Sequence, residues 1–194
     1  RALMGGAATG AAPMTGACAD WKSRTSSTTR AHLTQTKFAS LPISPLTVRA
    51  ILEVMRYEVL TAVQAQTLPV ILQGFDVIAK AKTGTGKTMG FLLPTIERIL
   101  VAVHSGTRGI HALVISPTRE LAFQIGEQFE ALGSVIGVKC AVAVGGVDMM
   151  AQAIMLAKRP HIVVATPGRL VCACMAMRCP WKTPSIHPAK PWMT

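Results

Sequence analysis

The sequence predicts an α/β domain in which a parallel β-sheet is covered by helices on both faces. Short apolar runs typical of buried strands alternate with longer stretches whose apolar residues recur at helical spacing. A glycine-rich segment, residues 81–88, lies between one such strand and the helix that follows it. Further polar and glycine-containing segments follow the later strands. Because ligands of parallel sheets bind where the strands end, these segments are predicted to lie at one edge of the sheet.

The folded domain is expected to begin near Phe38. Residues 1–37 contain a single acid and show no sustained period, so we predict a flexible basic N-terminal tail. Ser44 followed by Pro45 indicates the first helix start, because serine caps helices and proline fits their first turn. Downstream we predict strands at 76–79, Ala112–Ile115, 138–144 and 161–165, and helices at 88–101, 118–136 and 149–158.

The composition restricts the class of protein. A chain of 194 residues is long enough for one substantial domain and short for two. Twenty Lys and Arg against nine Asp and Glu give a formal charge of +11, which favours an anionic partner such as nucleic acid. No apolar run of about 18 residues is free of charge and proline, which argues against a membrane span. The cysteine pattern indicates reduced thiols in an intracellular compartment, with the nucleus, nucleolus or an organelle left open.

The glycine-rich segment has the pattern of a phosphate-binding loop. Its backbone N–H groups and the positive end of the following helix would form a cradle for the phosphates of a nucleotide. The lysine near its end would reach the outer phosphates, and the threonine after it would bind Mg²⁺ through its hydroxyl. The first position holds alanine where the usual pattern has glycine. The predicted nucleotide site comprises Ala81, Lys82, Thr83, Gly84, Thr85, Gly86, Lys87 and Thr88.

Residues 57–64, upstream of the loop, read Tyr-Glu-Val-Leu-Thr-Ala-Val-Gln. Together with the loop they resemble the Q motif and motif I of the DEAD-box family of ATP-dependent RNA helicases. The resemblance implies that the Gln64 amide reads adenine, that Thr61 belongs to the same site, and that Tyr57 and Phe38 lie near the base. A glutamine amide suits this task because its donor and acceptor match those of adenine. Without the loop nearby, Gln64 would be interpreted as an ordinary helix-surface residue.

Three segments that each follow a predicted strand resemble the RNA-contacting motifs of the same family. Residues 117–122 resemble motif Ia, the two glycines after the next strand resemble the family's double glycine, and residues 166–169 resemble motif Ib. The resemblance implies contacts with the RNA backbone that do not depend on base sequence, and hydroxyls, N–H groups and arginines at helix starts suit phosphates. Alone, Thr118 would be a helix cap and the glycines a turn. The predicted RNA-binding residues are Pro117, Thr118, Arg119, Gly145, Gly146, Thr166, Pro167, Gly168 and Arg169.

The family's acidic motif has no counterpart in the sequence. In the family, the strand after motif Ib carries Asp-Glu-Ala-Asp, whose acids hold Mg²⁺ and help to activate the attacking water, and a second RecA-like domain follows. No carboxylate side chain follows Asp148 in this chain, so we assign no catalytic residue. Residues 171–194 lack a periodic pattern and are predicted to be an unrelated, disordered tail.

The resemblance therefore implies the first RecA-like P-loop NTPase domain of a DEAD-box RNA helicase, incomplete, at residues 38–170. ATP with Mg²⁺ and RNA phosphates are expected to bind, whereas hydrolysis and unwinding are expected to be absent. The part up to about residue 100 is closest to plant members, and residues 111–169 are more like members that act in ribosomal RNA maturation. Two alternatives stay open: a non-catalytic RNA- or nucleotide-binding module that competes with a full-length helicase, and a non-folding product of an aberrant transcript.

Overall fold

The computed structural model describes residues 33–176, and the remaining parts of the two predicted tails lie outside the described residues. Two short helical turns, η3 and η4, accompany the helices and strands. The elements in chain order are β1 (Leu33–Lys37), η3 (Phe38–Ser40), α1 (Pro45–Ala50), η4 (Ile51–Met55), β2 (Val59–Thr61), α2 (Ala62–Leu72), α3 (Lys87–His104), β3 (Ala112–Ile115), α4 (Arg119–Ile136), β4 (Cys140–Ala143), α5 (Met149–Ala157), β5 (Ile162–Ala165) and α6 (Pro167–Ala176).

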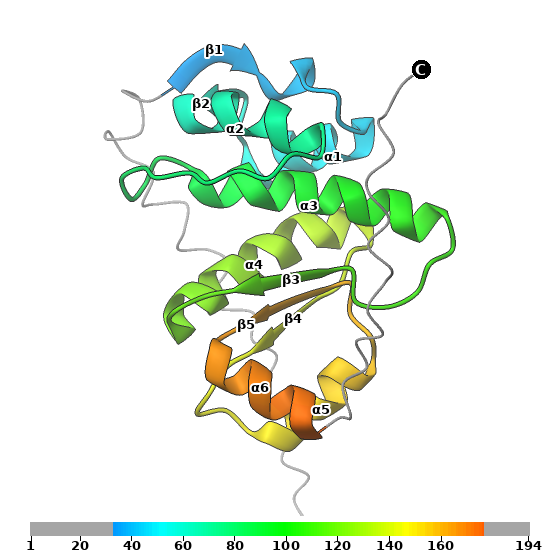
Figure 1. Cartoon of the computed structure of the whole chain (residues 1–194). Helices are drawn as coiled ribbons and strands as arrows, with labels where there is room; N and C mark the ends of the chain where they lie inside the picture. Colours follow the sequence, from blue (N-terminus) through cyan, green and yellow to red (C-terminus); the bar gives the residue numbers. More distant parts are fainter. Residues whose placement is uncertain (1–32, 177–194) are drawn as a thin grey trace, which may run out of the picture. The chain divides into compact units, whose positions relative to one another are not determined.

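The main sheet has three parallel strands in the order β3-β5-β4 (Figure 1). β5 lies at its centre and is buried along its whole length. The three strands end level, because Ile115 of β3 and Ala143 of β4 both pair with Ala165 of β5. The three strands predicted in this region are confirmed, and the segments that follow them therefore begin at the same edge of the sheet.

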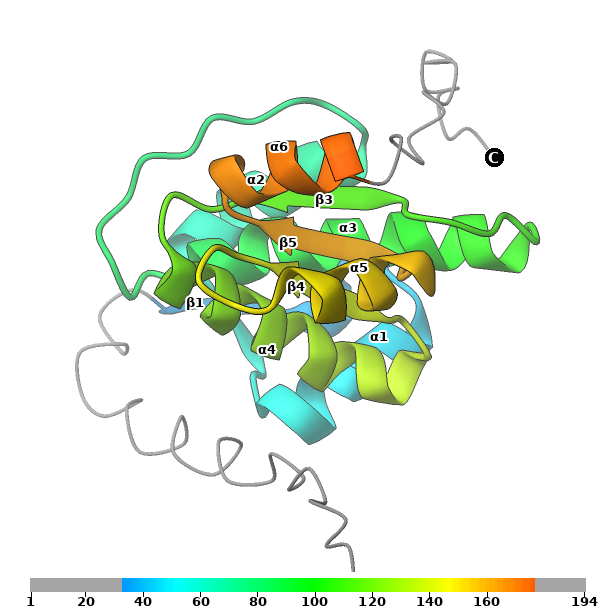
Figure 2. The ribbon, with the colours of Figure 1, turned by 90° about the horizontal axis from the view of Figure 1, so that it is seen from below.

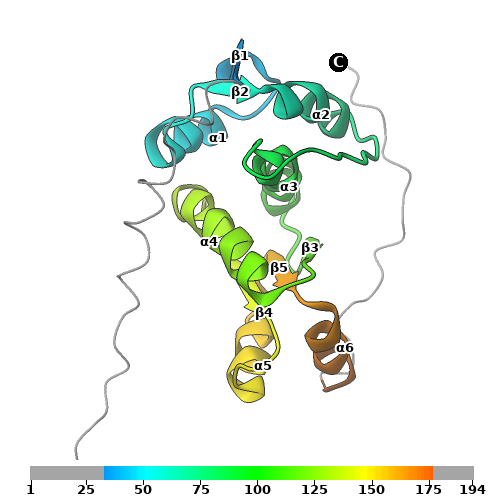
Figure 3. The ribbon, with the colours of Figure 1, turned by 90° about the vertical axis from the view of Figure 1, so that its left-hand side faces the viewer.

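Helices cover both faces of this sheet. On one face Ile162 and Val164 belong to the main core, which α4 and α3 complete. On the other face Val163 and Ala165 form a smaller core with α5 and α6. Both helices lie below the strands in Figures 1 and 3, and Figure 2 views the sheet from their side. This two-sided cover agrees with the continuous apolar runs that are typical of parallel strands buried on both faces. The predicted architecture of a parallel sheet flanked by helices is confirmed.

A short antiparallel pair, β1 and β2, precedes the main sheet. Because β1 begins at Leu33, the folded part starts earlier than predicted, and the tail boundary at residue 37 is wrong. The mostly exposed, polar residues of β1 gave no apolar signal, and only the pairing with β2 makes them a strand. Ser44 caps α1 by accepting the Thr47 N–H at 3.2 Å, and Pro45 is the first helical residue, as the sequence predicted.

The strand predicted at residues 76–79 is not formed. Residues 75–86 run from α2 to α3 as a loop, and Phe75 and Ile78 are 63% and 102% exposed. A strand needs a hydrogen-bonded neighbour, and no strand among the described residues pairs with this segment. β3 is an edge strand of the main sheet, and its Leu113 and Ile115 are 37% and 58% exposed. One edge of β3 is therefore unpaired among the described residues.

The C-terminal boundary of the domain also differs from the prediction. α6 begins at Pro167 and continues to Ala176, and its Leu170 and Ala173 pack on the smaller core. Residues 171–176 therefore belong to the fold and not to a tail. Between residues 33 and 176 no helix combines the length and apolar character needed to cross a bilayer.

Candidate phosphate-binding sites

The glycine-rich loop ends where α3 begins. Gly86 has a φ of 82° and directly precedes Lys87, so a left-handed glycine turns the chain into the helix. Lys87 Nζ donates to the carbonyl oxygens of Ala81 and Lys82 at 2.6 and 2.5 Å. The ammonium thus closes the loop on itself, and phosphate oxygens entering the loop would compete with these carbonyls for it. The first N–H groups of α3 have no acceptor within the helix and suit the same anion.

Thr61 and Gln64 connect the start of α2 to this loop. The Thr61 hydroxyl accepts the Gln64 N–H at 3.3 Å and donates to the Thr85 carbonyl at 2.9 Å. Gln64 is 3% exposed; its Oε1 accepts the Thr61 N–H at 2.9 Å and its Nε2 donates to the Gly86 carbonyl at 3.0 Å. A Cβ at Gly86 would lie 2.5 Å from Nε2, so glycine is required for this contact. The residue predicted to read adenine therefore also holds the loop.

The two aromatic residues predicted near the base differ in accessibility. Phe38 is 1% exposed and lies in the main core, and its predicted position near the base stays a prediction. Burial of a phenylalanine stabilises a fold by roughly 2–3 kcal/mol, which accounts for this placement. Tyr57 is half-buried, and burial raises the pKa of its hydroxyl above 10.0. Its predicted position near the base stays a prediction.

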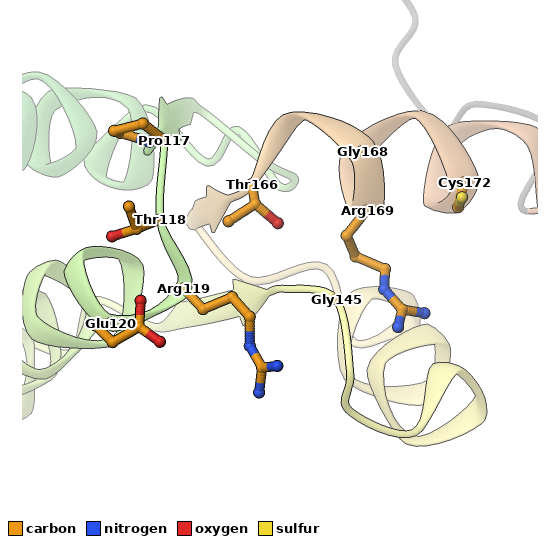
Figure 4. A pocket seen from close by; sticks show the side chains of 9 residues that line it. All are labelled: Pro117, Thr118, Arg119, Glu120, Gly145, Thr166, Gly168, Arg169 and Cys172. Carbon is orange, nitrogen blue, oxygen red and sulfur yellow. The ribbon is translucent and has the colours of Figure 1, made fainter.

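The three segments predicted to contact RNA surround one open pocket of about 610 Å³ (Figure 4). They are the β3–α4 turn, the β4–α5 turn and the start of α6, and each follows one strand of the parallel sheet. The lining residues are Pro117, Thr118, Arg119, Glu120, Gly145, Thr166, Gly168, Arg169 and Cys172. The pocket thus collects every predicted RNA-binding residue except Gly146 and Pro167, which are adjacent in sequence to residues that line it.

Two arginines bring positive charge to this pocket from different helices. Arg169 Nη2 donates to the Val147 carbonyl at 3.0 Å. Arg119 lies against Gly146, where a Cβ would be only 2.5 Å from Nη1. The only ion pair between residues 33 and 176 joins α1 to η4, so no carboxylate pairs with either guanidinium in this part of the chain. Both charges are therefore available to an anion.

Two helix starts contribute to the same pocket. Thr118 caps α4, because its Oγ1 accepts the Leu121 N–H at 3.3 Å. This is the capping role expected from the sequence, and it leaves the hydroxyl hydrogen available to a ligand oxygen. α6 begins directly after Thr166, with Gly168 and Arg169 in its first turn. The positive ends of both helices add to the attraction for an anion.

Glu120 and Cys172 also line the pocket, although the sequence analysis did not assign them to it. Cys172 belongs to the segment that was interpreted as a tail. Its spacing of four residues from Gly168 places both on one face of α6, a signal that a longer predicted helix would have revealed. Gln152 was also missed: it is 5% exposed, and its Nε2 donates to the Val144 carbonyl at 3.0 Å at the end of β4.

Comparison with known proteins agrees with this arrangement. The model of the family described as DEAD/DEAH box helicase matches residues 61–182. The chain belongs to this family. The match begins at Thr61, continues through the phosphate-binding loop and the three strand-end segments, and extends beyond the predicted domain end at residue 170. This extension agrees with the length of α6.

Curated relatives of the chain are named ATP-dependent RNA helicases. It is 57% identical over 117 residues to ATP-dependent RNA helicase DDX47 of Drosophila melanogaster, covering 60% of this chain and 22% of the relative. It is 53% identical over 119 residues to ATP-dependent rRNA helicase rrp3 of Emericella nidulans, covering 61% of this chain and 25% of the relative. The chain therefore spans about a quarter of the length of these relatives.

Solved structures of the family share the fold. The DEAD-box helicase Mss116 bound to ssRNA and UDP-BeF superposes with a TM-score of 0.67 and 35% identity, over 73% of this chain and 30% of that chain. A hypothetical ATP-dependent RNA helicase from Sulfolobus tokodaii gives a TM-score of 0.60 and 34% identity, over 69% of this chain and 37% of that one. The predicted RecA-like fold is confirmed.

Proposed function

We propose that the chain is a partial DEAD-box helicase core that binds ATP and the phosphate backbone of RNA without hydrolysing ATP. The observation that carries this proposal is the pocket in which three strand-end segments meet and which holds two guanidinium groups that pair with no carboxylate among residues 33–176. Hydroxyls, helix-start N–H groups and guanidinium groups bind phosphates without reading bases. RNA binding is therefore independent of sequence and weakens with salt.

ATP with Mg²⁺ is the proposed nucleotide. Lys87 and the start of α3 receive the phosphates, and Gln64 has one N–H and one lone pair left for an adenine edge after its two contacts with Thr61 and Gly86. No group of three His, Cys, Asp or Glu side chains within residues 33–176 is arranged to hold a metal ion. Mg²⁺ would therefore enter with the nucleotide and be held by its phosphates, by water and by the Thr88 hydroxyl.

Turnover of ATP is proposed to be absent from this chain. Phosphoryl transfer requires an acidic residue that holds the metal ion and a group that orients the attacking water. No Asp or Glu follows Asp148, so neither α6 nor the residues after it supply a carboxylate to the phosphate-binding loop. We therefore do not propose ATP-driven unwinding for this chain.

The relatives suggest a class of RNA and a compartment. One relative is named an ATP-dependent rRNA helicase, and an Mss116 structure contains single-stranded RNA. We infer that single-stranded segments of ribosomal RNA are the class of RNA bound, and that the chain acts inside the cell, in the nucleus or nucleolus. A chain that binds this RNA without turnover would compete with a full-length helicase for the same sites.

One observation favours a second candidate, a product that does not form a stable fold alone. Ile115 on the unpaired edge of β3 and Phe75 and Ile78 in the α2–α3 loop are apolar and strongly exposed. An exposed, unpaired sheet edge promotes association between chains. In this case the motifs would be inherited from a helicase without forming working sites.

Thermal unfolding of the 194-residue chain with Mg²⁺ and ATP, ADP or GTP tests the proposal. A cooperative transition whose midpoint rises with adenine nucleotides, and does not rise in a Lys87→Ala variant, is expected. RNA binding is measured separately by anisotropy of a labelled oligonucleotide, and ATP hydrolysis by phosphate release with and without RNA. RNA-stimulated phosphate release would refute the absence of turnover, and a transition without cooperativity would favour the second candidate.

A further inference from the structure

The β4–α5 turn contacts both guanidinium groups of the pocket through consecutive residues. Gly146 faces Arg119: a Cβ there would lie 2.5 Å from Nη1 and 3.0 Å from Cζ. The next residue, Val147, accepts a hydrogen bond from Arg169 Nη2 at 3.0 Å through its carbonyl oxygen. One short turn therefore contacts an arginine from α4 and an arginine from α6. Figure 4 draws both arginines.

The turn is itself held at both ends. At its start, the Val144 carbonyl accepts from Nε2 of Gln152, a side chain that is 5% exposed. At its end, the Asp148 carboxylate accepts the Met150 N–H at 2.9 Å and caps α5. Because hydrogen bonds fix both ends of the turn, its backbone holds one position relative to the two arginines.

We propose that Gly146 is a positioning residue that acts through Arg119. Because Gly146 has no side chain, the guanidinium of Arg119 can pack against the turn, next to Val147, which accepts the hydrogen bond from Arg169. Successive phosphates of a nucleic acid strand are spaced regularly, so two guanidinium groups bind them together only when their own separation is set. This inference rests on the proposed RNA backbone binding at the pocket and assigns a different role to Gly146 than a close approach of RNA to bare backbone.

Gly145 distinguishes these two roles. Nothing lies within 4 Å of a Cβ built on Gly145, and this residue lines the pocket directly. An RNA strand that needs bare backbone would meet Gly145, whereas the guanidinium of Arg119 occupies the space next to Gly146. Close approach of RNA therefore explains at most the first glycine of the pair.

Alanine at residue 146 is a clean test of this role. The atoms that its Cβ would meet belong to the far end of a flexible side chain, so the clash is relieved when Arg119 moves away. Gly146 also has a φ of 74°, where alanine is strained. Gly106→Ala controls for this strain, because Gly106 has a φ of 78°, is exposed, lies outside the pocket and has nothing within 4 Å of its Cβ.

RNA affinity would be measured by fluorescence anisotropy of a short labelled oligouridylate at several salt concentrations, with the full chain. Arg119→Ala should lower the affinity about tenfold and reduce the salt slope by roughly 0.7, the loss of one phosphate contact on a single strand. Gly146→Ala should reproduce both effects, and Gly106→Ala should bind like the unchanged chain. The double variant of Gly146 and Arg119 should bind no more weakly than Arg119→Ala alone.

The proposal is overturned if the two effects add in the double variant, or if Gly146→Ala binds like Gly106→Ala. If Gly146→Ala does not fold, Gly146→Asn takes its place, because asparagine tolerates left-handed backbone and still displaces Arg119. Failure of the proposed function looks different: Arg119→Ala and Arg169→Ala would then both bind RNA as the unchanged chain does, or the unchanged chain would not bind RNA.

Discussion

Replacing Gln64 by alanine is expected to destabilise the fold even when no nucleotide is present. Its amide joins two backbone groups, the Thr61 N–H at 2.9 Å and the Gly86 carbonyl at 3.0 Å, in a position where the side chain is 3% exposed. Alanine leaves the buried Thr61 N–H without a partner, which costs about 1–3 kcal/mol, and leaves the half-buried Gly86 carbonyl without one at a smaller cost, because water partly reaches it. The free energy of unfolding should therefore fall by roughly 2–4 kcal/mol. For a domain of this size, that lowers Tm by roughly 5–15 °C.

The assay is thermal unfolding followed by circular dichroism, first without nucleotide and then with Mg²⁺ and ATP. Gln66→Ala is the matched control, because Gln66 lies on the same helix and is exposed, and its Tm should change little. If Gln64→Ala unfolds at the temperature of Gln66→Ala without nucleotide, the hydrogen bonds to Thr61 and Gly86 contribute nothing to stability. Gln64 would then act on the nucleotide alone, and the argument that it holds the loop would be refuted.

Three further predictions concern the strands of the main sheet. Burial, together with His111 and Lys139, lowers the pKa of His161 below 6.5, and its Nδ1 accepts the Lys139 N–H at 2.9 Å. The unfolded chain therefore binds a proton at this histidine more readily than the folded chain does. The contribution of His161 to the free energy of unfolding is fully present above about pH 6.5 and decreases as the pH falls toward the lowered pKa. Denaturant unfolding across this range measures the effect, and His161→Gln should remove most of it. Burial raises the pKa of Cys140 to about 12, so at about pH 8 roughly one thiol in ten thousand is ionised, and iodoacetamide should modify exposed Cys172 well before Cys140 in the folded chain. Equal modification rates in a peptide map would contradict this burial. Ile115→Lys, on the open edge of β3 where the side chain is 58% exposed, should reduce light scattering on heating with little change in Tm, and unchanged scattering would show that this edge does not drive association.

The elements that could be predicted from the sequence are those whose signal is local. Short apolar runs identified β3, β4 and β5, and serine before proline identified the start of α1. The strand at residues 76–79 was wrong because apolar character indicates burial but does not provide a neighbour to pair with, and this segment has none among the described strands. The burial of Phe38 could not be read from the sequence either, since an aromatic residue before a nucleotide motif suits a base contact and a core position equally well. Its 1% exposure is a consequence of packing that no local pattern contains.

The pocket could be predicted for a reason that does not extend to its glycines. Parallel strands in register end at one edge, so segments that follow them must meet, and three weak motifs become one site as soon as the sheet is correct. The role of Gly146, in the β4–α5 turn, depends instead on the side chain of Arg119, which lies at the start of α4 and far away in sequence. A glycine that makes room for a distant side chain and a glycine that lets a ligand approach have the same sequence pattern. Only the position of the Arg119 guanidinium distinguishes the two roles. The decisive measurement is therefore the coupling between the Gly146 and Arg119 substitutions in RNA affinity, and not the effect of either substitution alone.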